Sequence, residues 1–156
     1  MNLGFQVVGD KELKRKLKRL TGKQFIKAVK SAAGKSMTPV AREIRKNVHL
    51  DQPIPFTGRT GLTTKEQEKL LKKAVGKRTK NLGRGSAIFA VAGIKGGYML
   101  RKLGLPSNSA HLVEFGTRRS SPQPFIRPAI KNLRSQSVQV YTKELSAWII
   151  KNAKKK

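Results

Sequence analysis

The side chains that most often carry catalysis are scarce in this sequence. His49 and His111 are the only imidazoles, and neither has the spacing of a metal ligand or of a base that activates a nucleophile. The eight acidic residues are scattered, so no pair of carboxylates predicts a general acid and its base. The absence of cysteine excludes disulfides and thiolate zinc sites. We therefore expect a protein that is not an enzyme, with no catalytic residues, cofactor or metal.

Two glycine-containing stretches resemble phosphate-binding loops only superficially. Residues 93–97 follow an apolar segment, but they lack the Gly-x-x-x-x-Gly-Lys-Ser/Thr spacing, and no clear helix follows. Residues 83–85 share only the composition of such a loop. Both stretches are better interpreted as turns.

The charge balance points to a polyanionic neighbour. The chain has 35 lysines and arginines against 8 acidic residues, a formal net charge of +27. Such a field attracts nucleic acid, an anionic membrane or acidic protein surfaces, although a basic face can also serve only solubility. No apolar run approaches a membrane span of about 18 residues, and no signal peptide is recognisable at the start of the chain, so we expect a soluble protein made in the cytoplasm. Candidate contacts to DNA or an acidic partner are Arg59, Lys77, Arg78, Lys80 and Arg84.

Base-specific recognition of nucleic acid is not indicated. Most of the nine aromatic residues fall on predicted core faces, which leaves few rings to stack on bases. No zinc finger, RNA-binding motif or clear helix-turn-helix signature is present. Any contact to nucleic acid is expected to involve phosphates, without sequence preference and with strong salt sensitivity.

The segment from Ala110 to Ile130 combines more special backbone chemistry than any other. A short apolar run, 111–115, ends at Gly116, where the backbone can turn freely. A basic loop follows, and three prolines within seven residues then predict a stiff arm. Glu114 is the only acid in this segment. Two interpretations stay open: an exposed strand position near cationic neighbours, or a salt bridge to Arg118, Arg119 or Arg127, in the same chain or from an adjacent subunit.

The same segment carries a resemblance. Residues 112–117 (LVEFGT) and 124–129 (PFIRPA) resemble the signature of the tail-component, or tail-completion, proteins of long-tailed bacteriophages, and 57–59 (TGR) is similar to another element of that family. The resemblance implies a non-enzymatic virion protein at the neck, assembled as a sixfold ring. Its implied partners are a tail terminator or tail-tube protein, a head-connector protein, and double-stranded DNA in the lumen, bound without sequence preference; no membrane is involved.

The arm suits an interface between subunits. We expect Phe125, which looks exposed, and Ile126 to enter an apolar groove of a neighbour while Arg127 pairs with an acid; the alternative is that they fold back onto their own chain. The candidate subunit or partner interface comprises Glu114, Phe115, Gly116, Thr117, Arg118, Arg119, Pro124, Phe125, Ile126, Arg127 and Pro128. The runner-up function is a non-specific basic nucleic-acid-binding protein. A toxin or nuclease is disfavoured because no catalytic cluster is present.

The elements that must position this arm form a single domain of the α+β class. We expect a small, mostly antiparallel sheet packed with a long N-terminal helix and a C-terminal helix. The predicted order is a strand at 1–9, a helical region at 10–50, a loop with a short helix and a possible insertion at 51–85, a sheet with the proline-rich arm at 86–127, a helix at 128–152 and a basic tail at 153–156.

Four local predictions refine this order. The apolar stripe of the second helix keeps its phase across Pro39, which predicts one long kinked helix. Thr64 and Gln67 have the spacing of a capping box, and 77–84 is interpreted as a basic connector. Residues 86–94 are apolar on both faces, so we expect a covered central strand, paired with a last strand at 111–115. An apolar stripe marks the C-terminal helix: Ile130, Leu133, Val138, Tyr141, Leu145, Trp148 and Ile149.

Overall fold

The structure is a computed structural model that describes residues 22–54, 61–82, 87–95 and 110–153. The predicted strand at 1–9, the start of the predicted helical region and nearly all of the basic tail lie outside these ranges. So do two of the candidate contact residues, Arg59 and Arg84. Within the described residues, the order is helix, helix, two strands, short helix and long helix.

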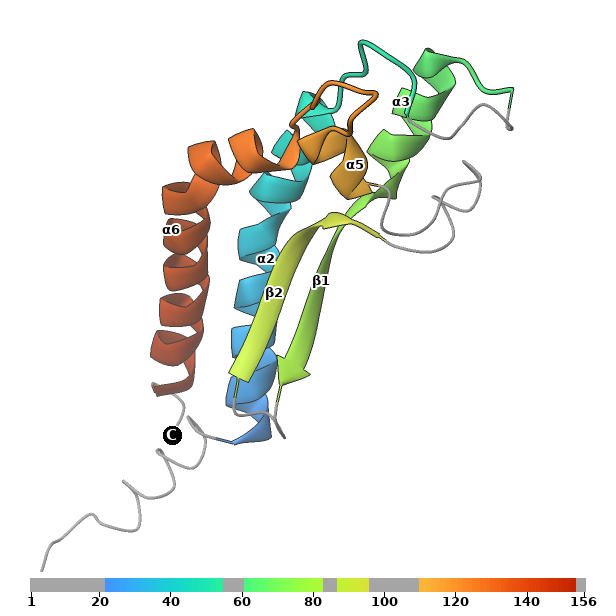
Figure 1. Ribbon diagram of the computed structural model, residues 1–156. Helices are drawn as coiled ribbons and strands as arrows, with labels where there is room; N and C mark the ends of the chain where they lie inside the picture. The colour runs from blue at the N-terminus through green and yellow to red at the C-terminus, as the bar shows by residue number, and fades with distance from the viewer. Residues whose placement is uncertain (1–21, 55–60, 83–86, 96–109, 154–156) are drawn as a thin grey trace, which may run out of the picture.

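Helix α2 (Lys23–Asn47) is the central element, and the sheet and helix α6 (Ile126–Ala153) lie against different sides of it (Figure 1). Its buried side includes Val40, Ala41 and Ile44. The helix is continuous through Pro39, as predicted, although proline lacks the N–H that would bond the carbonyl four residues earlier. Burial of the stripe on both sides of the proline offsets that loss.

Helix α3 (Thr64–Ala74) begins at the residue that was predicted to be its cap. Thr63 is the N-cap: its hydroxyl accepts from the Glu66 amide at 3.3 Å, and the Glu66 carboxylate accepts from the Thr63 amide at 2.9 Å. The predicted box at Thr64 and Gln67 is therefore wrong by one position. Gln67 is buried instead, where its side chain accepts from the amide of Ile54 at 2.9 Å and donates to the carbonyl of Leu62 at 2.9 Å. It ties the chain before α3 to the helix.

The sheet is formed by different strands from those predicted. Helix α3 leads directly into β1 (Val75–Leu82), which pairs antiparallel with β2 (Ala87–Ile94) from Val75↔Ile94 to Leu82↔Ala87. The predicted connector at 77–84 is thus mostly a strand. Sequence pattern misses it because its outward positions are basic, and pairing with β2 and packing on α2 supply the stabilisation. Strand β2 is where it was predicted, but the expectation that it is covered is wrong for the described residues, since Phe89 is 53% exposed.

The predicted last strand is a helix. Residues Ala110–Phe115 form α5, so they do not pair with β2. A five-residue apolar run fits either conformation, and here α5 is fixed by contacts to the start of α6, described below. Helix α6 begins at Ile126, two residues before the prediction, with Pro128 in its first turn, where proline is tolerated.

The first turns of α6 run crosswise to α2, and the rest of the helix then runs antiparallel beside α2 (Figure 1). The rings of Phe25 and Trp148 lie 5.8 Å apart near one end, and Lys35 Nζ lies 2.6 Å from the Glu144 carboxylate. Part of the predicted stripe of α6 faces solvent, because only one side of the helix contacts α2: Ile130, Val138 and Ile149 are exposed.

The main core lies at the other end, where the C-terminal half of α2, helices α3 and α5 and the start of α6 converge (Figure 1). Its largest members include Ile44, Ile54, Leu71 and Phe125. The arrangement is α+β, with a long helix, a two-stranded antiparallel sheet and a C-terminal helix, which confirms the predicted class.

Candidate interaction site

Glu114 connects α5 to the start of α6, and we call the junction of these two helices the corner. Its side chain is only 3% exposed, and its carboxylate accepts hydrogen bonds from the backbone amides of Phe125 at 2.8 Å, Ile126 at 2.9 Å and Arg127 at 2.8 Å. The first amides of a helix have no partner within the helix, and a negative charge is favourable at that end. Glu114 therefore caps α6 from α5. The interpretation of Glu114 as an exposed strand position is therefore wrong, because it is buried in a helix. Within the described part of the chain its donors are backbone amides, and a salt bridge from an adjacent subunit stays a prediction.

The loop after α5 is held by a glycine turn. Gly116 has φ of 76°, and a side-chain Cβ there would lie 2.8 Å from both the Pro122 nitrogen and the Ser120 carbonyl oxygen. The Thr117 amide donates to the Ser120 carbonyl at 2.8 Å, and these two residues form an isolated antiparallel bridge. The two residues between them, Arg118 and Arg119, are exposed at the tip of this turn.

The second half of the loop is tied to the segment that follows α2. The Gln123 amide donates to the Val113 carbonyl at 2.8 Å, and the Gln123 side chain accepts from the Asp51 amide at 2.8 Å. Gln52 donates to the Ser121 carbonyl at 3.2 Å. These hydrogen bonds tie the arm to the core, and the stiffness of the arm stays a prediction.

Phe125 does not look outward. Its side chain is 1% exposed and belongs to the chain's own core, so the premise that it is exposed is wrong. Ile126 is half-buried and packs on the same core. The outward groups near the corner are instead Phe115, 58% exposed, and Arg127, whose guanidinium lies 4.0 Å from the centre of the Phe115 ring. The corner therefore exposes a cation on an aromatic ring beside the turn that carries Arg118 and Arg119, which we call the arginine turn.

The predicted contacts on β1 divide between the two faces of the sheet. Lys77 donates to the Thr38 hydroxyl of α2 at 2.6 Å, so it lies on the inner side. Arg78 and Lys80 pair in register with Val91 and Phe89 and share the outer face with them. Side chains that are exposed on this face include Phe89 and Val91.

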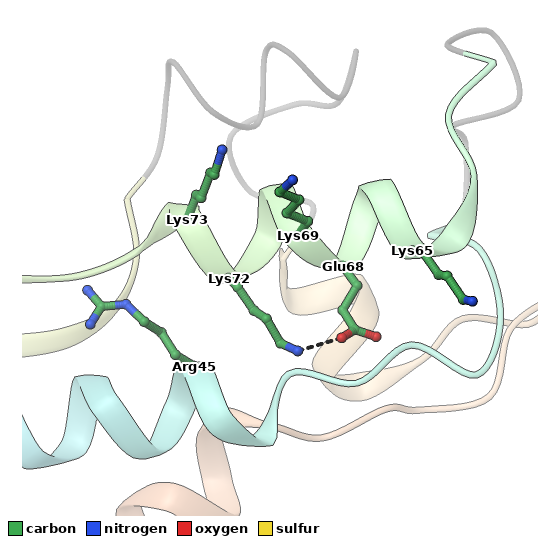
Figure 2. Close-up of a pocket in the computed structure, with 6 residues that line it drawn as sticks. All are labelled: Arg45, Lys65, Glu68, Lys69, Lys72 and Lys73. Atoms are coloured by element: carbon green, nitrogen blue, oxygen red, sulfur yellow. Dashed lines mark hydrogen bonds and ion pairs between the residues drawn. The ribbon is translucent and has the colours of Figure 1, made fainter.

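A second basic surface, not predicted from the sequence, lies where α3 passes the end of α2. A hollow of about 470 Å³ is lined there by charged residues alone: Arg45, Lys65, Glu68, Lys69, Lys72 and Lys73 (Figure 2). We call these residues the α3 basic hollow. The signal that could have found it is the four-residue spacing of Lys65, Lys69 and Lys73, which places the three on successive turns of a helix.

Glu68 is the single carboxylate of the hollow, and it already has partners. It accepts from Lys72 one turn further on and from the Leu50 amide at 3.2 Å, and His49 Nδ1 lies 3.3 Å from it. The hydrogen bond from Lys72 is the main cause that lowers the pKa of Glu68 from its ordinary value. Arg45 donates to the Val75 carbonyl at 3.0 Å. Among the described residues, no carboxylate lies within ion-pair distance of Lys65, Lys69 or Lys73.

Comparison with known families assigns the chain. Residues 11–116, more than half of the sequence, match the model of the HK97-gp10-like family, which is described as "Bacteriophage HK97-gp10, putative tail-component". The chain belongs to the HK97-gp10-like family. The recognised resemblance to phage tail components is thereby confirmed. No curated protein and no solved structure gave a significant match.

The extent of the HK97-gp10-like match is informative about the corner. It contains α2, α3, both strands and α5, and it ends at Gly116, before the arginine turn and α6. Glu114 thus lies within the family region, while the amides that it caps lie beyond it. The half of the resemblance carried by 124–129 also falls outside the match.

Two further findings hold for the described part of the chain. None of its helices combines the length and apolarity that crossing a bilayer requires. No three His, Asp or Glu side chains there are grouped so that they could hold a metal ion.

Proposed function

We propose that this chain is a tail-completion subunit of a long-tailed phage, a structural and non-enzymatic protein of the neck that joins the tail tube to the head connector around the DNA channel. The observation that carries the proposal is the match to a family of phage tail components over residues 11–116. Tail components are parts of the virion, so the surfaces that matter are those that meet other virion proteins and DNA.

The corner between α5 and α6 supports a joining role because its exposed groups are held in place. Burial of Glu114 and Phe125 anchors the loop from within, and Gly116 allows the turn that carries Arg118 and Arg119. A preorganised contact loses less conformational entropy on binding than a mobile one. The arginine turn, with Arg127 over Phe115, is the surface that meets an acidic partner in the tail tube or connector.

A ring requires two different patches on each subunit, one for each neighbour. The corner is one patch of this kind. The outer face of the sheet, where Phe89 and Val91 are exposed beside Arg78 and Lys80, is a second and lies on another part of the chain. Two such surfaces are compatible with a closed ring, and the proposed sixfold number comes from the resemblance to tail-completion proteins.

The alternative function is a free, non-specific nucleic-acid-binding protein. The net charge of +27 favours it, since such a field attracts any duplex. The two functions differ in what the corner does: a joining protein needs it for assembly, whereas a free nucleic-acid-binding protein does not.

Assembly in the parent phage tests the proposal. We expect Arg118→Ala with Arg119→Ala, and separately Arg127→Ala, to leave the purified protein folded while free heads and free tails accumulate. These side chains are exposed, so their loss removes a contact and leaves the core intact. Electron microscopy of lysates counts heads, tails and joined particles.

Lys143→Ala is the matched control. Lys143 is exposed on α6, about 25 Å along the helix from the corner, and its replacement also removes one positive charge. Particle yield should stay normal in this variant. Normal yield in the arginine variants as well would refute the role of the corner in joining.

A further inference from the structure

The α3 basic hollow concentrates more positive charge than the neighbouring carboxylates neutralise. Its lining has five cationic side chains and one carboxylate. The carboxylate, Glu68, accepts from Lys72, so this pair is internally compensated.

Lys65, Lys69 and Lys73 remain, four residues apart on successive turns, where like charges repel. Figure 2 shows Lys69 and Lys73 pointing to one side of α3 and Lys65 to the other. The pKa of Glu66 is lowered by the hydrogen bond from the Thr63 amide and, to a lesser extent, by the charge of Lys69. The repulsion among the three lysines weakens an isolated helix, and a bound polyanion would relieve it.

The lining favours phosphate over a protein partner. Protein interfaces depend on aromatic or apolar anchors seated in pockets, and lysine is depleted there. None of the six lining residues is aromatic or purely apolar, although the alkyl stems of their side chains form most of the surface of the hollow. Non-specific binding to DNA, in contrast, needs only cations that reach phosphate oxygens. The smaller hollow beside β1 differs, since it includes Val91 and Ile94.

The spacing of the three lysines also fits a duplex. Lys65, Lys69 and Lys73 span eight residues of helix, about 12 Å. B-DNA carries one phosphate for about each 1.7 Å of its axis, so about seven phosphates lie within that length. Counted on one strand, the spacing is about 3.4 Å, which is still closer than that of the lysines, so phosphates are available to them whatever the base sequence.

We propose that the α3 basic hollow is a binding site for the phosphate backbone of double-stranded DNA, and that Lys65, Lys69 and Lys73 make the contacts. This inference deepens the proposed function and rests on it, because only in a neck ring would α3 face the DNA of the channel. The binding itself is a property of the purified chain and can be measured apart from assembly.

The test compares two triple variants of equal charge in the full-length protein. One is Lys65→Gln/Lys69→Gln/Lys73→Gln, and the matched control on α6 is Lys131→Gln/Lys143→Gln/Lys151→Gln. All six lysines are exposed on helices, and glutamine has a similar helix propensity, so both variants should fold. Fluorescence anisotropy with two short duplexes of unrelated sequence, across a series of sodium chloride concentrations, gives the affinity and its salt dependence.

We expect the α3 variant to lose affinity for both duplexes equally. Each phosphate contact contributes about 0.9 to the slope of log K against log salt, so the slope should become less steep by about 2.7. At about 0.15 M salt this corresponds to a loss on the order of 100-fold. The α6 control should keep the slope of the native protein within about one unit.

Two outcomes would overturn the proposal. Equal losses in both variants would show that diffuse charge, and no particular site, binds DNA. An unchanged slope in the α3 variant, with selective loss of binding to polyglutamate, would assign the hollow to an acidic protein. The result is separable from the assembly test, because the arginine variants of the corner leave α3 intact and the α3 variant leaves the corner intact.

Discussion

Replacement of Glu114 is the most direct probe of how the interaction site is built. In Glu114→Ala, the amides of Phe125, Ile126 and Arg127 lose their acceptor at the start of α6. Losing a helix cap typically costs about 0.5–2 kcal/mol, and hydrogen bonds to a charged group contribute about 1.5–3 kcal/mol each. Water can reach some of the freed amides, because Ile126 is only half-buried. We therefore expect the free energy of unfolding to fall by about 3–5 kcal/mol.

Glu144→Ala is the matched control. Glu144 also accepts a hydrogen bond, from Lys35 at 2.6 Å, but both side chains are partly exposed, at 39% and 56%. Exposed ion pairs contribute about 0–1 kcal/mol, so this variant should unfold close to the native protein. Urea unfolding followed by circular dichroism measures both variants. Equal small losses would refute the conclusion that Glu114 caps α6, and so would an unaltered midpoint in Glu114→Ala.

Three further predictions follow from the same geometry. Phe125→Ala should lower the free energy of unfolding, measured in urea, by about 3–5 kcal/mol because the ring is buried, whereas Phe115→Ala should lower it by less than about 1 kcal/mol because Phe115 is exposed. The reverse order would indicate that Phe125 is a surface residue. Gly116→Ala should lower the melting temperature more than Gly61→Ala, since both have positive φ but only Gly116 is crowded; equal shifts would argue against the tight turn. The pKa of Glu68 is lower in the folded protein than its unfolded value of about 4.3, so the ionised carboxylate stabilises the fold above that pH, and this stability is lost as the pH falls through the folded pKa. Glu68→Gln should therefore make the free energy of unfolding depend less on pH in the acid range. An unchanged dependence on pH would contradict this prediction.

Elements with a long apolar period were predictable from sequence. Helix α2 keeps its stripe across Pro39, and β2 and α6 also lie close to their predicted positions. The class follows from these three elements. Strand β1 was not predictable because its sequence, KRTKNL after Gly76, has no apolar alternation, and its conformation depends on β2 and α2.

The sequence drew attention to the segment 110–130 but did not reveal how its residues contact one another. The run at 111–115 is too short for its period to separate helix from strand. The acceptor role of Glu114 depends on amides that are 11 to 13 positions away, so local pattern could not reveal it. Phe125 looked exposed because prolines and polar residues surround it, yet the corner folds it inward. The lysine spacing of α3, in contrast, was visible in the sequence.

Imaging the neck of the parent virion by cryo-electron microscopy tests the joining role most directly. The proposed function predicts a sixfold ring of this chain between the head connector and the tail tube, with the arginine turn against a neighbouring protein and α3 toward the DNA. A neck reconstruction whose density is fully occupied by other proteins, with this chain located elsewhere in the tail or absent from the particle, would contradict it.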